Sequence, residues 1–132
     1  MSNANTRQVG GEHYKSEYQH WDFVHDMALG YFEGQITKYI SRHRRKNGAQ
    51  DVQKAIHFAT KLRELAERNR RSPVRSNPNV PLIEAYIRGN QLTPPEGVVI
   101  RSVCNWSTAL DLAELTARLY DILEGYDTSA HD

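Results

Sequence analysis

Four polar side chains between residues 35 and 45 have a spacing that suits anion binding. Gln35, Lys38, Arg42 and Arg45 follow one another at intervals of three, four and three residues. In an α-helix these intervals place side chains along one face. Guanidinium groups donate paired hydrogen bonds to phosphate oxygens and lysines add point charge, so the pattern predicts a phosphate-binding helix face.

The next segment carries a second polar set with a similar spacing, namely Asp51, Lys54 and Lys61. If the two segments are helices joined by a tight turn, their polar faces meet and their cations converge on one groove. Lys46 falls in the connecting turn and adds a further positive charge. The alternative is that these cations form a solvated face that holds no ligand.

A glycine pair and three aromatic residues extend the same candidate site. Gly10 and Gly11 have no Cβ atoms, so their backbone N–H groups can approach an anion closely. Tyr14, Trp21 and Tyr39 offer flat faces on which a nucleotide base can stack. Each feature alone is common in proteins that bind no nucleotide, whereas together they favour a nucleotide-binding surface built from residues 10–54.

The elements that must position these residues are predicted to be helices. Apolar residues recur at intervals of three and four over Glu33–Arg45 and over Gln50–Arg70. The sequence Lys46-Asn47-Gly48 between them is typical of a turn, so the two helices are predicted to form an antiparallel hairpin. Further helices are predicted over residues 22–31, 80–88 and 108–125.

Two segments leave part of the fold open. Thr93–Gly97 contains two prolines and is interpreted as a break between elements. Residues 98–105 are rich in β-branched side chains, which fits either a strand or the start of a buried helix. The predicted fold class is therefore mostly α, with a helical hairpin core and a minor strand left open near 98–105.

Charge and composition divide the chain along its length. Residues 35–75 contain 12 Lys or Arg and 3 acidic residues, whereas residues 105–132 contain 6 acidic residues and 1 arginine. This division predicts a basic site for an anionic ligand and an acidic C-terminal helix that packs on the core or on a neighbouring subunit. The expected organisation is a disordered N-terminus (1–8), a nucleotide-binding core (9–71), a linker (72–81) and a helical extension (82–132).

A set of residues in the first half of the chain resembles a known family in both order and spacing. The set comprises Val9-Gly10-Gly11-Glu12-His13-Tyr14, Trp21-Asp22-Phe23, Gly34, Lys38-Tyr39, Arg42, Lys46-Asn47-Gly48, Asp51, Lys54-Ala55 and Leu62. It resembles a bacteriophage family catalogued as a domain of unknown function, which includes a small phage nucleotide kinase acting on deoxynucleoside monophosphates. The resemblance covers roughly residues 9–65. Two positions differ from the family pattern: Gln35 stands where the family often has Asn, and Phe58 stands where a Tyr is common. Any role of a hydroxyl at position 58 is therefore lost.

The resemblance implies a phage protein in the cytoplasm of an infected bacterial host, a nucleotide ligand and a homo-oligomer. A kinase-like activity would take ATP as phosphate donor, with Lys38, Arg42 and Lys54 on the phosphates and His13 or Asp51 as base. The sequence lacks G-x-x-x-x-G-K-[ST], requires no cofactor and predicts no metal site. His13 equally fits a structural hydrogen bond, and Asp51 a helix cap or an ion pair.

Other functions remain open from the sequence. An oligomeric sponge that sequesters cyclic or modified nucleotide immune signals of the host needs the same cations and aromatics but no base. The pairs Glu64/Glu67 and Asp111/Glu114 have the spacing of carboxylates that hold Mg²⁺ in all-α nucleotide pyrophosphatases, although such pairs are common on solvated helices. Nucleic-acid binding ranks third, because no recognised motif accompanies the arginines and the C-terminal helix is acidic.

The remaining features argue against other classes of protein. The first eight residues lack the apolar core of a signal peptide. No stretch approaches the ~20 apolar residues that span a bilayer, so no membrane association is expected. The single cysteine, Cys104, allows no intramolecular disulfide and is predicted to be buried.

Overall fold

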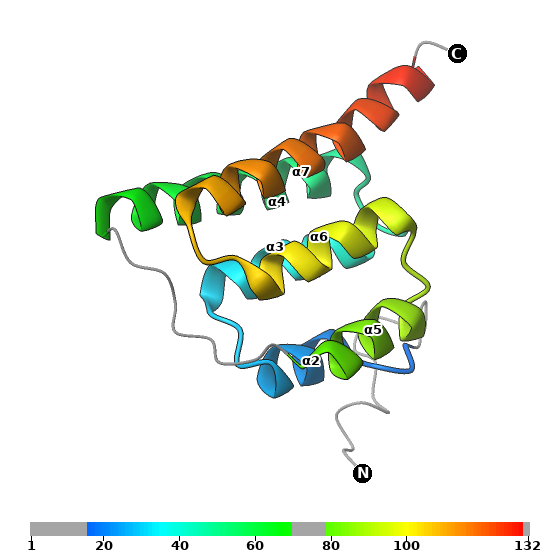
Figure 1. Cartoon of the computed structure of the whole chain (residues 1–132). Coiled ribbons are helices and arrows are strands. Elements are labelled where there is room, and N and C mark those ends of the chain that lie inside the picture. Colours follow the sequence, from blue (N-terminus) through cyan, green and yellow to red (C-terminus); the bar gives the residue numbers. More distant parts are fainter. Residues whose placement is uncertain (1–15, 70–78, 131–132) are drawn as a thin grey trace.

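The computed structural model describes residues 16–69 and 79–130, and within them it contains helices and no strand. Figure 1 shows three layers: α4 and α7 lie along one side, α3 and α6 form the middle, and α2 and α5 lie on the opposite side. The mostly α fold predicted from the sequence is confirmed. The helices are α2 (His20–Asp26), α3 (Tyr31–Arg42), α4 (Ala49–Asn69), α5 (Val80–Gly89), α6 (Pro94–Asn105) and α7 (Ala109–Ala130).

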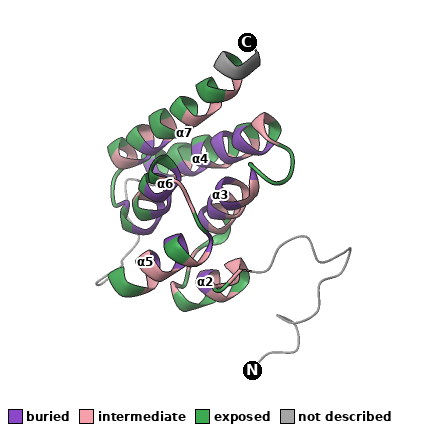
Figure 2. Cartoon of the chain, turned by 90° about the vertical axis from the view of Figure 1, so that its right-hand side faces the viewer, coloured by how far each residue is buried: buried purple, intermediate pink, exposed green. Residues whose placement is uncertain are grey.

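The α3–α4 hairpin forms as the apolar periodicity predicts. Gly48 adopts φ +56° in the connecting turn, a conformation that glycine takes without strain. The buried face of α4 meets Ile36 and Ile40 of α3 on one side and Leu115 and Leu119 of α7 on the other. Apolar residues of α6 close the same core, so four helices share it (Figure 2).

A second, smaller core joins α6 to the layer formed by α2 and α5. Phe23 of α2 stacks on Tyr86 of α5 with ring centroids 4.1 Å apart. Ile100 and Cys104 of α6 are buried against the same cluster, which confirms the burial predicted for the cysteine. Because α6 buries one face in each core, it fixes the α2–α5 layer relative to the hairpin.

The segment from Thr93 to residue 105 corrects the sequence interpretation. The break expected at Thr93–Gly97 is replaced by the start of α6, which spans Pro94–Asn105, and of the two alternatives left open for residues 98–105 the buried helix is confirmed. The Thr93 side chain accepts a hydrogen bond from the Glu96 backbone, and the Glu96 side chain accepts one from the Thr93 backbone. This capping box starts the helix, and the prolines occupy the first turn, where no backbone donor is needed.

Several helix boundaries also differ from those predicted. The first described helix, α2, ends at Asp26 rather than near residue 31, and α3 starts at Tyr31 and ends at Arg42 rather than at residue 45. The last helix continues beyond Gly125 to Ala130, since a single glycine weakens a helix without ending it. Leu110, in the first turn of this helix, is 69% exposed.

No helix among the described residues has the length and apolar character needed to cross a membrane.

Candidate functional site

The cations of α3 and α4 converge on one aromatic ring. The Lys38 ammonium lies 5.1 Å from the centroid of the Tyr39 ring, the Arg42 guanidinium carbon 4.8 Å, and the Lys54 ammonium 5.3 Å. We call these four residues the Tyr39 cluster. The negative face of an aromatic ring attracts cations at such distances and favours their clustering despite mutual repulsion. The hairpin therefore brings together the three cations that the helical spacing selected.

One of the three cations is partly neutralised by a buried carboxylate. Arg42 donates from Nε and Nη2 to the two carboxylate oxygens of Asp51, at 3.2 and 3.3 Å. Asp51 has no exposed surface, and it also accepts from the backbone N–H of Asn47 at 3.2 Å. Burial alone would raise the pKa of Asp51, but these hydrogen bonds lower it, so the group is a carboxylate at neutral pH. Among the described residues, the three cations and the Asp51 carboxylate together carry two more positive than negative charges.

The Asp51 geometry also bears on its candidate role as a base. An ionised carboxylate held by an arginine and a backbone N–H is stabilised in its charged form and is a poor proton acceptor. Asp51 pairs with Arg42 and accepts from the backbone of Asn47, just before α4. These contacts match the structural role, as a helix cap or ion-pair partner, that was the alternative to a catalytic base. Asp51 therefore orients Arg42 toward the Tyr39 ring.

A row of aromatic side chains holds the Tyr39 ring in place. Phe58 of α4 stacks on Tyr39 with centroids 6.0 Å apart and planes inclined by 14°. Phe58 in turn contacts Tyr31 and Phe32 at the start of α3. Since Tyr39 is engaged by Phe58 and by three cations, it anchors those cations rather than offering a free platform to a base.

A third helix, α2, contributes His20 to the surroundings of the Tyr39 cluster. Its Nε2 lies 2.7 Å from Oγ1 of Thr37, whose own hydroxyl donates to backbone carbonyls of α3 at 3.0 and 3.1 Å. When the Thr37 hydroxyl donates to these carbonyls, it accepts from His20 with the ring proton on Nε2. Burial and the positive charge of Lys38 lower the pKa of His20 to about 4, so the ring is neutral at pH 7. Nothing in the sequence spacing links His20 to Lys38, because the contact depends on how α2 packs on α3.

The other residues proposed from the sequence lie apart from the Tyr39 cluster or outside the described chain. Arg45 donates from Nη2 to the backbone oxygen of Ser41, and Lys46 is exposed in the turn after α3. Trp21 lies on α2 with 55% of its surface exposed. The remaining proposed residues, which lie outside the described residues, are Gly10, Gly11, His13 and Tyr14.

A second polar cluster lies at the C-terminal end of α3. His43 Nε2 donates to Glu96 of α6 at 2.6 Å, and His43 Nδ1 lies 2.5 Å from the hydroxyl of Tyr126 of α7. Arg44 donates to both oxygens of the same carboxylate, at 2.8 and 3.1 Å. We call these four residues the His43 network. Glu96 and Tyr126 lie 53 and 83 positions from His43 in the sequence, so local spacing gives no signal for this network.

The charged and polar groups of this network satisfy one another within the fold. Glu96 is 1% exposed, and burial alone would raise its pKa. Hydrogen bonds from His43, Arg44 and the backbone of Thr93 outweigh burial and bring the pKa of Glu96 to about 2. Burial and the nearby Glu96 charge raise the pKa of Tyr126, so its hydroxyl stays protonated.

The carboxylate pairs suggested as metal ligands do not assemble into a metal site. No group of three or more potential metal-binding side chains occurs among the described residues. Asp111 Oδ2 accepts from the backbone N–H groups of Ser107 and Thr108 at 2.8 and 3.0 Å, so this carboxylate caps the start of α7. Glu67 pairs with Arg63 one turn earlier on α4. Both carboxylates therefore have local structural partners.

Comparison with known proteins places the Tyr39 cluster within a recurring sequence unit. Residues 9–60 match the model of DUF3310, a family described as a protein of unknown function. The matched segment includes α2, α3 and the first half of α4, and hence His20, Lys38, Arg42, Asp51 and Lys54. A search of the curated proteins and of the solved structures finds no match to this chain. The family description names no activity, so function must be argued from the site.

Proposed function

We propose that this protein binds phosphate-bearing nucleotides, with a phosphate group held by Lys38, Arg42 and Lys54. The observation that carries the proposal is the convergence of these three cations on the Tyr39 ring, where Asp51 pairs with Arg42 and no other acidic partner of the three is seen within residues 16–69 and 79–130. Cations held close together without enough anions are stabilised by an added anion. A phosphate dianion would match the excess of two positive charges.

The chemistry of the cluster suits a phosphate better than a carboxylate. Arg42 is already oriented by Asp51, which reduces the conformational entropy lost when its remaining donors bind. The two lysines supply rotatable donors from different helices, α3 and α4, and can reach separate oxygens of one group. A nucleotide would then extend from the phosphate over the neighbouring surface of α2 or α4.

The resemblance adds finer expectations to this proposal. It supports a phage protein in the cytoplasm of its bacterial host, acting on deoxynucleoside monophosphates as a kinase-like enzyme with ATP as phosphate donor. The alternative within the same proposal is an oligomeric sponge that binds cyclic or modified nucleotide signals without changing them. Both use the same cations, and both include self-association of the chain.

Binding is tested by titrating inorganic phosphate and each deoxynucleoside monophosphate into the full chain by calorimetry. Lys54→Gln is the informative variant, because it removes one cation of the Tyr39 cluster and leaves the ion pair of Arg42 intact. Lys61→Gln is the matched control, because Lys61 is an exposed lysine on the same helix. We expect Lys54→Gln to weaken binding and Lys61→Gln to leave it unchanged. Equal affinities in all three proteins would refute the site.

Catalysis and sequestration are separated by following the fate of the ligand. The protein is incubated with ATP, Mg²⁺ and a bound monophosphate, and products are resolved by chromatography. Sustained formation of diphosphate, lost in Lys54→Gln, supports the kinase-like activity. Stoichiometric binding of unchanged nucleotide supports the sponge instead.

A further inference from the structure

A row of aromatic rings leads from the Tyr39 cluster to an exposed tyrosine. Phe58 stacks on Tyr39, and Tyr31 contacts Phe58 at a centroid distance of 5.9 Å with planes inclined by 69°. Tyr39 and Phe58 are half-buried, whereas Tyr31, the first residue of α3, is 66% exposed. The row therefore begins at the three cations and ends at an aromatic ring on the surface.

The Tyr31 ring has the features of a platform for a nucleotide base. Its contacts with Phe32 and Phe58 are inclined by 88° and 69°, and no ring within residues 16–69 and 79–130 is seen stacked parallel to it. These inclined contacts hold the ring in place. Because a fixed ring loses little conformational freedom when a base stacks on it, such stacking is favourable. Tyr31 thus offers the stacking surface that Tyr39, engaged by Phe58 and the cations, does not.

The distance along α3 sets the length of the ligand. Tyr31 and Tyr39 are eight residues apart, which corresponds to about 12 Å along a helix axis. In a nucleoside monophosphate a single sugar separates the phosphate from the base, and this separation is too short to cover that distance. Gln35 lies midway, four residues from each tyrosine and on the same side of the helix, so its side-chain amide can donate to a group between the two ends.

We propose that Tyr31 stacks on the base of a nucleotide whose phosphate is held by the three cations of the Tyr39 cluster, and that at least one further phosphate lies between the two. The ligand class is therefore a nucleoside polyphosphate or a dinucleotide, because both place a base more than one sugar away from a bound phosphate. The inference rests on the proposed function. It directs the nucleotide along the α3–α4 hairpin rather than over α2.

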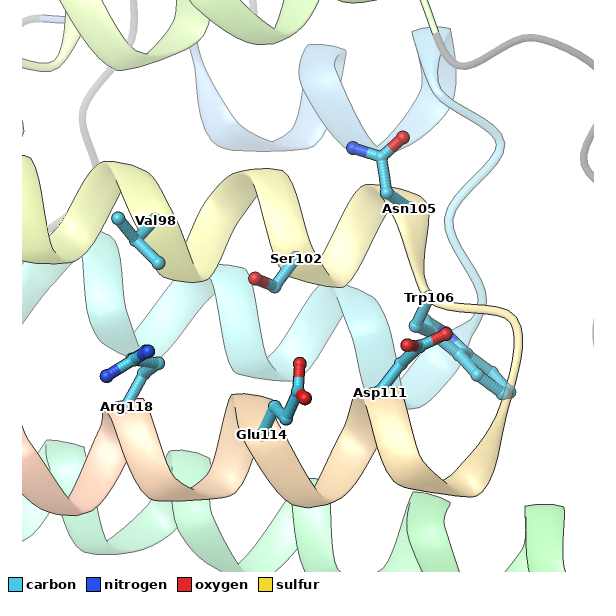
Figure 3. Close-up of a pocket in the computed structure, with 7 residues that line it drawn as sticks. All are labelled: Val98, Ser102, Asn105, Trp106, Asp111, Glu114 and Arg118. Atoms are coloured by element: carbon cyan, nitrogen blue, oxygen red, sulfur yellow. The ribbon is translucent and has the colours of Figure 1, made fainter.

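A groove between α6 and α7 is also lined by charged side chains but does not suit this ligand. It has a volume of about 340 Å³, and its lining includes Asp111, Glu114 and Arg118 of α7 (Figure 3). Arg118 pairs with Asp121 at 3.5 Å, which offsets its positive charge. The two acids that remain in the groove would repel a phosphate, so the hairpin surface is favoured.

Calorimetry on the full chain with four matched ligands, in the absence of Mg²⁺, tests the proposal. ATP and the 5′-phosphorylated dinucleotide pApA carry a base beyond a further phosphate, AMP carries its base one sugar away, and tripolyphosphate carries none. Tyr31→Ala is expected to weaken binding of ATP or pApA by about fivefold or more, the effect of losing one stacked base, and to leave AMP and tripolyphosphate unchanged. The ligand that responds more strongly shows whether phosphates or a second nucleotide form the spacer.

Three further variants control for the ring, the fold and the position. Tyr31→Phe keeps the ring and should keep the affinity for ATP and pApA. Tyr31→Leu keeps an apolar contact with Phe58 without a flat ring and should behave as Tyr31→Ala does. Tyr120→Ala removes a ring that is 50% exposed on α7 and should bind every ligand as the unchanged protein does. Circular dichroism checks that each variant is folded.

The outcomes separate this inference from the proposed function. If ATP and pApA bind equally well to the unchanged protein, Tyr31→Ala and Tyr31→Leu, while Lys54→Gln still weakens both, the inference is overturned and the phosphate site stands. An equal loss for AMP in Tyr31→Ala would overturn the assigned ligand class, and a loss in Trp21→Ala instead of Tyr31→Ala would place the base on α2. If neither inorganic phosphate nor any of the four ligands binds, the proposed function itself fails.

Discussion

The Tyr39 cluster draws on the last turns of α3 and the His43 network begins at the residue that follows this helix, yet the two differ in how their charges are balanced. In the His43 network, Glu96 accepts from both His43 and Arg44, and the remaining ring nitrogen of His43 meets the Tyr126 hydroxyl. In the Tyr39 cluster, Arg42 pairs with the buried carboxylate of Asp51, whereas Lys38 and Lys54 contact the Tyr39 ring. The polar groups of the His43 network bond to one another, whereas the ammonium groups of Lys38 and Lys54 in the Tyr39 cluster face an aromatic ring and can still donate hydrogen bonds to a ligand.

This difference separates a structural role from a binding role. A buried network with every partner in place joins α3, α6 and α7 and would gain nothing from a ligand. A surface cluster with excess positive charge costs stability in the free protein, and an anion removes that cost. His43 and Arg44, which directly follow α3, thus serve the fold, whereas Lys38 and Arg42 within the helix belong to the proposed binding site.

The largest effect is expected from Glu96→Ala. This substitution leaves His43 and Arg44 without their carboxylate and removes half of the capping box of α6. Removing the buried acceptor leaves the His43 ring N–H without its partner, which costs about 1–3 kcal/mol of unfolding free energy, and losing the capping box costs about 0.5–2 kcal/mol more. Urea denaturation measures the loss, and Glu84→Ala, which breaks an exposed pair with Arg101, is the control expected to change little. Equal stability of the two variants would mean that the His43 network does not hold the helices together.

The second largest effect is expected from pH, because the residues of the two regions should lose their contributions to folding stability in different pH ranges. His20 beside the Tyr39 cluster has a folded pKa of about 4 against 6.5 in the unfolded chain, so the unfolded state binds more protons between these values. Stability is therefore full above pH 6.5 and falls by ~3 kcal/mol as the pH drops toward 4. Glu96 has a folded pKa of about 2 against 4.5 in the unfolded chain. Its contribution to folding stability is therefore lost only at lower pH, between 4.5 and 2.

Denaturation at a series of pH values measures the two steps. His20→Gln keeps a side-chain donor for Thr37 without a titrating ring, so it should flatten the upper step and leave the lower one. Saturating inorganic phosphate should make the upper step smaller, because an anion bound beside Lys38 offsets the charge that depresses the pKa of His20 and brings the folded pKa closer to the unfolded one. An upper step unchanged in His20→Gln would show that another group causes it.

Removing the cations one at a time should distinguish binding from folding within the Tyr39 cluster. Lys38→Ala and Lys54→Ala are each expected to weaken phosphate binding by roughly 1.5–3 kcal/mol, the range for hydrogen bonds to charged groups, with little effect on unfolding. Arg42→Ala should weaken binding similarly but also destabilise the fold, because it leaves Asp51 buried without its ion pair. The sequence alone gave the same expectation for Lys38 and Arg42, and the buried carboxylate is what separates them.

Calorimetry and denaturation on the same preparations test this division. If Arg42→Ala folds as stably as Lys38→Ala, the pair with Asp51 contributes nothing measurable to the fold. If all three variants bind phosphate as the unchanged protein does, the ligand lies elsewhere.

How far the sequence predicts this molecule depends on the range of the contacts. The hairpin and the convergence of Lys38, Arg42 and Lys54 follow from helical spacing and one turn, which are local. His20 and Glu96 were missed because their partners are 17 and 53 positions away and depend on how whole helices pack. Residues 98–105, for which the sequence left both a strand and a helix open, belong to α6, because the capping box outweighs the weak β preference of the valines. The residues of that capping box, Thr93 and Glu96, are a local signal in the sequence.

The smallest effect comes from deleting one hydroxyl group in each region. Tyr126→Phe leaves His43 Nδ1 without its partner and is expected to cost about 0.5–1.5 kcal/mol of unfolding free energy, with phosphate affinity unchanged. Tyr39→Phe should change neither quantity, because the cations contact the ring and its hydroxyl makes no hydrogen bond within the described residues. The same chemical edit therefore tests both regions. A loss of phosphate affinity in Tyr39→Phe would show that the ligand uses the hydroxyl, and Tyr39 would then be a ligand-binding group as well as an anchor for the cations.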